Sequence, residues 1–291
     1  FAKAADYCNV TQPTLSSMIQ KLEEELSVKI FDRSKQPIKP TAEGMLIIER
    51  AWNILVRAKQ LKEVVEEERH SLSGTFHVAV LPTIAPYLIP RFLPQLMNEY
   101  PELDIRVTEM KTEDIHKALK HGDIDAGIVA QVEGQEGFDS EHLYFEKFFV
   151  YVSKGDALFN NKAIRTVDLT GEYLWLLDEG HCFREQLVKF CHLKSAAKSK
   201  KAYNLGSIET FMRIVESGKG VTFIPELALE QLTEVQKELV RSFAHPIPTR
   251  DIILLTQKNF LRTSLRQLII DKIRAAVPTD MLQMNKMQQA L

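Results

Sequence analysis

The segment TQPTLSSMIQKLEEEL, residues 11–26, decides the fold at the start of the chain. Thr11 is a suitable helix N-cap, and Pro13 suits the first helical turn, where its missing N–H would have no partner. Apolar residues follow at i, i+4 and i+7, the spacing of one helix face: Leu15, Ile19 and Leu22. The pattern therefore predicts a helix that begins at Thr11 and turns these three side chains inward.

The polar face of this helix is predicted to bind DNA. A short helix over residues 2–7 precedes it, with Val10 in the turn, so the two form a helix-turn-helix. Cys8, at the end of the short helix, is expected in the core. Polar side chains on the second helix can reach base edges and phosphates in a major groove. The candidate DNA-binding residues on it are Thr11, Gln12, Pro13, Thr14, Ser16, Ser17 and Gln20.

Residues 30–40 predict a small extended hairpin beside the helix-turn-helix. The segment IFDRSKQPIKP holds three cations and two prolines. A wing of this kind lies along the phosphate backbone, and Arg33 and Lys35 are its candidate contacts. A surface loop with lysine and proline could have the same composition without any such role. Residues 1–40 are therefore predicted to form a winged helix-turn-helix DNA-binding domain.

Residues 41–73 predict one long helix. No proline occurs between Thr41 and Leu72, and apolar residues step by 4, 3, 4, 3 and 4. That spacing forms the seam of a coiled coil, so we expect a linker helix that pairs with a second copy. The alternative is a helix packed against its own domain. The seam consists of Ile47, Ala51, Ile54, Ala58, Leu61 and Val65.

The remainder, residues 74–291, alternates strand and helix patterns, which indicates an α/β domain. Strands are expected at 75–81, 103–109, 126–129, 145–152, 220–224 and 252–257, and helices at 86–100, 112–120, 207–217 and 263–276. The order predicts two α/β lobes, because residues 252–276 have the pattern of a return to the first one. Lobe I is expected to comprise about 75–146 and 251–291, and lobe II about 147–250.

The segment GHCFREQLVKFCH, residues 180–192, contains two of the three cysteines. A helix is expected to start at Cys182, because three residues have the spacing of an apolar face: Phe183, Leu187 and Phe190. Neighbouring cations and the helix N-terminus favour a thiolate at Cys182, with a lowered pKa. An unbroken helix would hold the Cα atoms of Cys182 and Cys191 about 13 Å apart. A disulfide tolerates about 7 Å, so joining them would require the helix to unfold.

Two other interpretations of this segment stay open at this point. Cysteines at such a spacing are often small buried hydrophobic residues without chemistry. Zinc is a further possibility, because two cysteines and two histidines form an acceptable ligand set: His181, Cys182, Cys191 and His192. The compact pairs typical of zinc sites are missing, so we expect no metal and no cofactor.

Composition excludes several classes of protein. Of the 291 residues, 45% are hydrophobic, and the net charge of −2 offers no basic field, so DNA binding must rest on a local motif. No apolar run approaches the ~20 residues of a membrane span. No phosphate-binding loop, zinc-protease motif or serine-hydrolase motif occurs. The low cysteine content with one close pair fits a cytoplasmic protein. The missing enzyme motifs and membrane span lead us to expect no enzymatic activity and no membrane partner.

The N-terminal motifs resemble the winged helix-turn-helix of the LysR family of transcriptional regulators. The match runs through residues 1–5, 11–16, 22–23, 26, 31, 33 and 41–44. It implies that the first helix of the domain is missing from this sequence, and that a dimerising linker helix leads to a two-lobed, periplasmic-binding-protein-like α/β regulatory domain. The resemblance also implies a homodimer or homotetramer that binds double-stranded operator DNA and contacts RNA polymerase.

Within that family, residues 180–191 and the segment LPTIAPYLIP, residues 81–90, resemble the peroxide-sensing members. The resemblance implies control of oxidative-stress genes through a reversible disulfide that hydrogen peroxide forms and a cellular thiol reduces. Cys182 would be the peroxidatic and Cys191 the resolving thiol. The implied peroxide pocket consists of Thr83, Thr112, His181, Arg184 and Arg250. The alternatives are a LysR regulator that binds a small metabolite in its cleft, and a thiol peroxidase, against which the DNA-binding helix argues.

Overall fold

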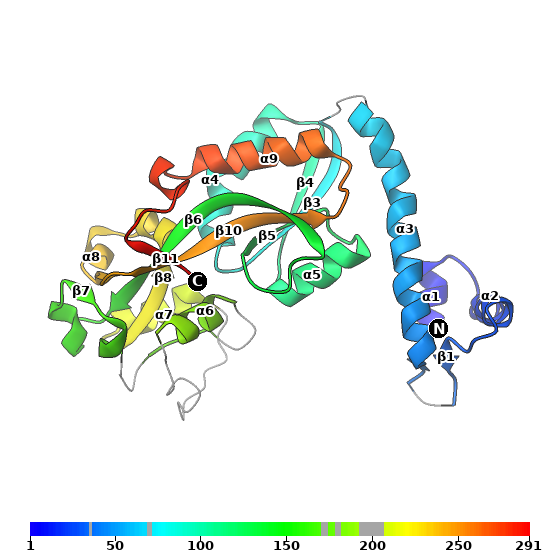
Figure 1. The fold of residues 1–291 in the computed structure, drawn as a ribbon, viewed down its shortest axis with the longest axis horizontal. Helices are drawn as coiled ribbons and strands as arrows, with labels where there is room; N and C mark the ends of the chain where they lie inside the picture. Colours follow the sequence, from blue (N-terminus) through cyan, green and yellow to red (C-terminus); the bar gives the residue numbers. More distant parts are fainter. Residues whose placement is uncertain (35–36, 69–71, 170–173, 178–181, 192–206) are drawn as a thin grey trace. The chain divides into compact units, whose positions relative to one another are not determined.

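A computed structural model of the chain describes residues 1–34, 37–68, 72–169, 174–177, 182–191 and 207–291. It divides into two compact units, residues 1–61 and 62–291. The long helix α3, Ala42–Glu68, belongs to both units, because the division falls inside it (Figure 1). The predicted domain boundaries at residues 40 and 73 remain predictions.

The first unit contains the predicted helix-turn-helix and hairpin. Its elements are α1 (Ala2–Tyr7), α2 (Gln12–Glu25), β1 (Phe31–Asp32), β2 (Lys39–Pro40) and the first part of α3. Thr11 is the N-cap of α2, and its Oγ1 accepts a hydrogen bond from the Thr14 amide at 3.4 Å. The antiparallel strands β1 and β2 pair Phe31 with Pro40. Sequence patterns therefore predicted these local elements correctly.

Two packing predictions in this unit were wrong. Cys8 is exposed, because it is the C-cap of the six-residue helix α1, whose buried side chain is Ala5. Leu22 is 43% exposed, whereas its neighbour Glu23 is the buried residue of α2. Glu23 is turned inward because its carboxylate accepts hydrogen bonds from the backbone that leads into the wing. A specific polar contact has thus overridden the apolar spacing.

The predicted linker helix forms as α3, and its predicted seam is largely open to solvent in the single chain. Within α3, the only side chains beyond Ala58 that the structure describes are those of Leu61 and Val65. Ile54 is 69% and Leu61 70% exposed, and Val65, Ala51 and Ala58 are also exposed, while Ile47 is half-buried. The five exposed positions leave most of the seam uncovered by the described residues. Pairing with a second copy remains a prediction.

The second unit is built on a nine-stranded sheet in the described part of the chain, with the path β4-β3-β5-β10-β6-β9-β7. In addition, β11 pairs with β10, and β8 pairs with β6. The strands are β3 (Gly74–Val80), β4 (Leu103–Glu109), β5 (Ala126–Ala130), β6 (Phe138–Val152), β7 (Ala163–Ile164), β8 (Val221–Pro225), β9 (Val240–Phe243), β10 (Ile247–Gln257) and β11 (Gln288–Ala290).

Helices cover the sheet and close its core. They are α4 (Ala85–Glu99), α5 (Thr112–His121), α6 (Cys182–Phe190), α7 (Ile208–Glu216), α8 (Glu234–Lys237) and α9 (Thr263–Ala276), with short 3-10 turns η1 (Ala157–Asn160), η2 (Thr166–Asp168), η4 (Glu226–Gln231) and η5 (Thr279–Met281). The predicted helices match their observed counterparts within one or two residues. Helices α4 and α9 lie side by side (Figure 1). None of the described helices has the length and apolar content of a membrane span.

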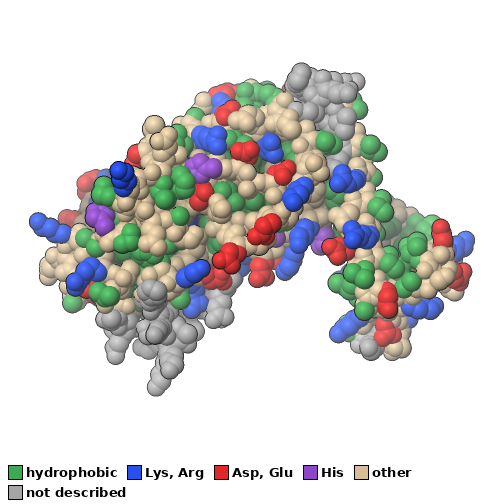
Figure 2. All heavy atoms as spheres, viewed as in Figure 1, with side chains coloured by type: hydrophobic (Ala, Val, Ile, Leu, Met, Phe, Trp, Pro, Cys, Tyr) green, Lys and Arg blue, Asp and Glu red, His purple; other side chains and the backbone are tan. Residues whose placement is uncertain are grey.

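The strands β6 and β10 are longer than predicted, and they connect the two halves of the sheet. Sequence patterns indicated only residues 145–152 and 252–257, because polar residues such as Asp139 and Glu141 interrupt the apolar run. In the structure, residues 138–147 of β6 pair with β10, and residues 148–152 pair with β8. Positive and negative side chains are interspersed over the face drawn in Figure 2, as the small net charge suggests. The pairing of β6 with β10 brings Glu146 opposite Arg250.

Candidate functional site

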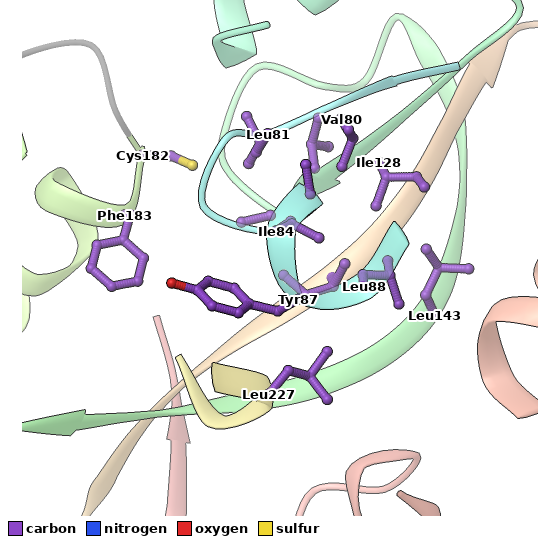
Figure 3. Close-up of a cluster of buried hydrophobic side chains, with 14 of the residues drawn as sticks. Val80, Leu81, Ile84, Tyr87, Leu88, Ile128, Leu143, Cys182, Phe183 and Leu227 are labelled. Atoms are coloured by element: carbon purple, nitrogen blue, oxygen red, sulfur yellow. The ribbon is translucent and has the colours of Figure 1, made fainter. Parts of the chain in front are cut away.

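Cys182 is the first residue of α6 and is only 5% exposed. Its side chain is part of the hydrophobic core of the second unit. In Figure 3 its sulfur points toward the loop that carries Leu81 and Ile84, while the ring of Phe183 lies near Tyr87. The predicted helix is present as α6, and Cys182 is its first described residue.

The thiolate predicted for Cys182 is not favoured. Burial raises the pKa of its thiol above the ordinary value, because a charged sulfur would lose its hydration. Three groups oppose that effect: the Arg250 guanidinium, the Thr112 hydroxyl and the Phe183 amide. The sequence displays nearby cations but not burial, and burial is the larger effect here.

Arg250 is completely buried beneath the N-terminal turn of α6. Its Nε donates to Glu146 Oε2 at 2.8 Å, and its Nη2 is 2.6 Å from the same oxygen. Nη1 donates to Thr83 Oγ1 and Nη2 to the Thr83 carbonyl, both at 3.0 Å. The guanidinium also lies 5.1 Å from the ring centroid of Phe183 and 5.6 Å from that of Phe148. Arg250 thus joins the β3–α4 loop to β6 and α6.

Several predicted pocket residues come together around the sulfur. Thr112 begins α5, and its buried Oγ1 has no other hydrogen-bond partner among the described residues, which leaves it available to the thiol. Arg250 and Thr83 lie in one hydrogen-bonded group. Arg184 is partly buried in the first turn of α6. His181 lies outside the described residues, so the peroxide pocket as a whole stays a prediction.

Glu146 was missed by sequence reasoning. A single glutamate in a strand pattern looks like a residue of the solvent face, yet Glu146 is 1% exposed. Its Oε1 accepts a hydrogen bond from the Leu227 amide at 3.3 Å. Burial raises its pKa, while Arg250 and the Leu227 amide act in the opposite direction. Only the register of β6 against β10 could have revealed the pair.

Cys191 lies at the other end of α6 and is also buried. Its amide donates to the Leu187 carbonyl at 2.9 Å, so helical hydrogen bonding continues to Cys191. Burial raises the pKa of its thiol to about 12. Both thiols are free, and nine helical steps of about 1.5 Å separate their Cα atoms by about 13 Å.

The structure supplies no support for a metal centre in the residues it covers. No three His, Cys, Asp or Glu side chains in the described ranges gather as a metal ion would require. His181 and His192, two members of the zinc alternative, lie outside those ranges.

The predicted DNA-binding face of α2 is mostly accessible. Its exposed candidates are Thr11, Gln12, Pro13, Thr14, Ser17 and Gln20, whereas Ser16 is half-buried. Arg33 of the wing donates to Ser16 Oγ at 3.3 Å and pairs with Glu23 Oε2 at 3.4 Å. Arg33 is therefore tied to α2, and 38% of its side chain remains exposed. Lys35 lies outside the described residues.

Glu23 fixes the start of the wing to α2. Its Oε1 accepts hydrogen bonds from the amides of Ile30 at 2.7 Å and Phe31 at 3.0 Å. The Phe31 amide, followed by the Ile30 amide and Arg33, holds the pKa of this carboxyl below its usual value despite the opposing effect of burial. The wing position therefore depends on an ionised side chain that the apolar pattern did not indicate.

Glu23→Ala is expected to release the wing while leaving α2 folded. Two amides would lose their acceptor, at a cost of about 1–3 kcal/mol for each unsatisfied group. Hydrogen exchange at Ile30 and Phe31 should therefore become faster. Glu24→Ala is the control, since the Glu24 carboxylate accepts a hydrogen bond from Gln20 within α2. Because the pKa of Glu23 is depressed, the protection should be present above its unfolded-state pKa and lost as pH falls through the folded one.

Comparison with known proteins places both units in one family. Residues 1–45 match the bacterial regulatory helix-turn-helix proteins of the lysR family, and residues 69–278 match the LysR substrate binding domain. The hydrogen peroxide-inducible genes activator of Dickeya chrysanthemi is 35% identical over 231 residues, which cover 79% of this chain and 75% of that protein.

Solved structures extend the similarity to 94% of the chain. Reduced OxyR from Porphyromonas gingivalis is 46% identical, with a TM-score of 0.68, and the match covers 74% of this chain and all of that one. A mutant OxyR from Corynebacterium glutamicum, solved with H₂O₂ bound, is 25% identical with a TM-score of 0.66, covering 94% of this chain and 87% of that one.

These matches confirm the predicted fold class of a LysR helix-turn-helix unit joined to a mixed α/β regulatory domain. The relatives are transcription regulators rather than enzymes. With α2 presenting polar residues and Cys182 buried at the start of α6, the chain belongs to the LysR family of DNA-binding transcription regulators and closely resembles its OxyR members.

Proposed function

We propose that this protein is a cytoplasmic transcription regulator that detects hydrogen peroxide by joining Cys182 and Cys191 in a reversible disulfide. The observation that carries the proposal is the pair of buried free thiols at opposite ends of one nine-residue helix. The names of the relatives, which refer to hydrogen peroxide and OxyR, support the same stimulus. Operator DNA, RNA polymerase and a cellular thiol reductant are its proposed partners.

The first chemical step is the oxidation of Cys182. The thiol loses its proton, and the thiolate sulfur attacks one oxygen of H₂O₂. The O–O bond breaks, sulfenic acid forms at Cys182, and the departing hydroxide takes up a proton to become water. Arg250, the Thr112 hydroxyl and the Phe183 amide support this step, because each stabilises the thiolate against the effect of burial.

The second step is disulfide formation. The Cys191 thiolate attacks the Cys182 sulfur, the S–O bond breaks, and hydroxide leaves with a proton as water. A Cα separation of about 13 Å in a helix exceeds the limit of about 7 Å for a disulfide, so α6 must unwind. Two electrons and two protons from cellular thiols would restore both cysteines. The redox event would thereby become a change of shape.

Unwinding has a cost that keeps the switch reversible. Phe183 and Leu187 are buried, and burial of such a side chain contributes about 1.5–3 kcal/mol. Phe190 packs edge-on against Phe243 with ring centroids 6.3 Å apart. Phe183 would also leave the face of the Arg250 guanidinium. Disulfide formation must offset these losses, so the oxidised state is expected to be only modestly favoured.

The exposed seam of α3 supports dimer formation as part of the function. Ile54 and Leu61 are large apolar side chains in contact with solvent in the single chain. Pairing of two α3 helices would cover them and bring two DNA-reading helices to two half-sites. In a dimer or tetramer, a change of shape at α6 would rearrange the contacts between regulatory domains. That rearrangement would alter the distance between the two DNA-reading helices.

One equivalent of peroxide is expected to remove two free thiols from the protein and to accelerate hydrogen exchange from Phe183 to Phe190. Mass measurement after thiol labelling counts the first effect, and exchange mass spectrometry records the second. Cys191→Ser serves as the control, because it allows sulfenic acid at Cys182 but no disulfide, and α6 should remain protected. Equal exchange before and after peroxide in the unsubstituted protein would contradict the unwinding mechanism.

A further inference from the structure

Glu146 is a buried acid that the proposed reaction does not use. It lies on β6 directly opposite Arg250 of β10, and the two side chains are 1% and 0% exposed. Burying two charges is expensive, and a buried ion pair often stabilises a fold no more than apolar residues of the same size. Stability alone is therefore a weak explanation for this pair.

The contacts restrict where the Arg250 charge can lie. Glu146 holds one edge of the guanidinium through Nε at 2.8 Å, and Thr83 holds the other edge through its hydroxyl and carbonyl at 3.0 Å. The rings of Phe148 and Phe183 lie within 5.6 Å of the guanidinium carbon. Phe183 follows Cys182 directly in the chain. The cation is therefore fixed beneath the turn that carries the reactive sulfur.

The same contacts determine how strongly that charge acts. An arginine guanidinium carries a permanent positive charge in proteins. A carboxylate at 2.6 Å forms an ion pair whose field falls off much faster than that of a free cation. Burial raises the pKa of Glu146, and the charge and hydrogen bonds of Arg250, with the Leu227 amide, oppose that effect by stabilising the carboxylate.

We propose that Glu146 is a positioning residue for the peroxide reaction: it holds Arg250 against Thr83 and Phe183, and it limits how much of the guanidinium charge reaches the Cys182 sulfur. This inference rests on the proposed function of Cys182. Arg250 without its counter-ion would make the Cys182 thiol more acidic and more reactive toward H₂O₂. Other groups that act on the sulfur or on Glu146 are Glu185, Glu226 and the Thr112 hydroxyl.

The test measures the ionisation of Cys182 in the full chain with Cys8→Ser and Cys191→Ser, where it is the last cysteine. Glu146→Gln keeps the shape and a hydrogen-bond acceptor for Arg250, which Thr83 and two rings still hold. The midpoint of the thiolate absorbance against pH should fall. The rate constant with H₂O₂ at neutral pH should rise by about threefold for each unit by which the pKa of Cys182 falls. Each unit gives about tenfold more thiolate, but a thiolate of lower pKa is a weaker nucleophile, which cancels part of the gain.

Three further variants separate this role from a structural one. Glu226→Gln removes a neighbouring carboxylate that binds Lys147 Nζ at 2.7 Å, and it should leave the midpoint unchanged. Glu146→Asp keeps the charge at a longer distance, so its midpoint should lie between those of the glutamine variant and the parent. In an Arg250→Gln background, Glu146→Gln should have no effect on the midpoint, because it acts through Arg250.

A midpoint in Glu146→Gln that equals or exceeds that of the parent overturns the proposal. The proposal is also overturned if Glu146→Gln shifts the midpoint by the same amount in the Arg250→Gln background. If Glu146→Gln fails to fold, Glu146→Asp replaces it in the test. A titration midpoint of Glu146→Asp at or above that of the parent then overturns the proposal. Failure of the parent to react with H₂O₂ would instead contradict the proposed function, and the pH titration would still report on Glu146 and Arg250.

Discussion

Cys182→Ser is expected to abolish the transcriptional response to hydrogen peroxide while leaving DNA binding intact. Serine replaces sulfur with a hydroxyl that is not ionised near neutral pH and is not oxidised by peroxide. The side chain is only slightly smaller, and it starts a helix well as an N-terminal residue, so α6 should still form. Expression from a promoter that the protein binds should fall to the uninduced level, and mobility shifts with operator DNA should match those of the unsubstituted protein.

Cys8→Ser is the matched control for this substitution. Cys8 is exposed at the end of α1, in the other unit of the chain, and it has no place in the proposed reaction. Its replacement should preserve the full response. An unchanged response in Cys182→Ser, or an equal loss in Cys8→Ser, would contradict the assignment of Cys182 as the peroxidatic thiol.

Ile54→Asp is expected to dissociate the dimer. In the single chain Ile54 is 69% exposed, so an aspartate there should cost little in folding. In a paired helix the same carboxylate would be buried in an apolar seam, at a cost of several kcal/mol. A loss of about 4 kcal/mol weakens association by about a thousandfold. Sedimentation velocity should therefore show a smaller particle at concentrations where the unsubstituted protein associates.

Asn53→Asp provides the comparison, because it introduces the same carboxylate one residue away, outside the seam and at an exposed position. It should leave the sedimentation coefficient unchanged. If both variants sediment like the unsubstituted protein, the seam does not form the dimer contact. If both dissociate, added negative charge rather than seam burial would explain the effect.

Residue spacing alone predicted several elements of this protein correctly. Thr11 and Pro13 mark the start of α2, and the apolar spacing of Phe183, Leu187 and Phe190 marks α6. Such features depend on neighbours within one or two helical turns, which a sequence displays directly. The position of Cys182 and Cys191 at the two ends of one helix follows from their spacing, and so does the unwinding that the proposed disulfide would require.

The tertiary structure decided what surrounds those residues. The sequence suggested an acidic thiol at Cys182, yet burial raises its pKa, and the cation that opposes burial is Arg250, distant in sequence. Glu146 and Arg250 meet only because β6 and β10 pair in a particular register. Burial and charge pairing depend on contacts between residues far apart in the chain. Local patterns carry no record of such contacts, so the folded chain alone determines the electrostatics of the site.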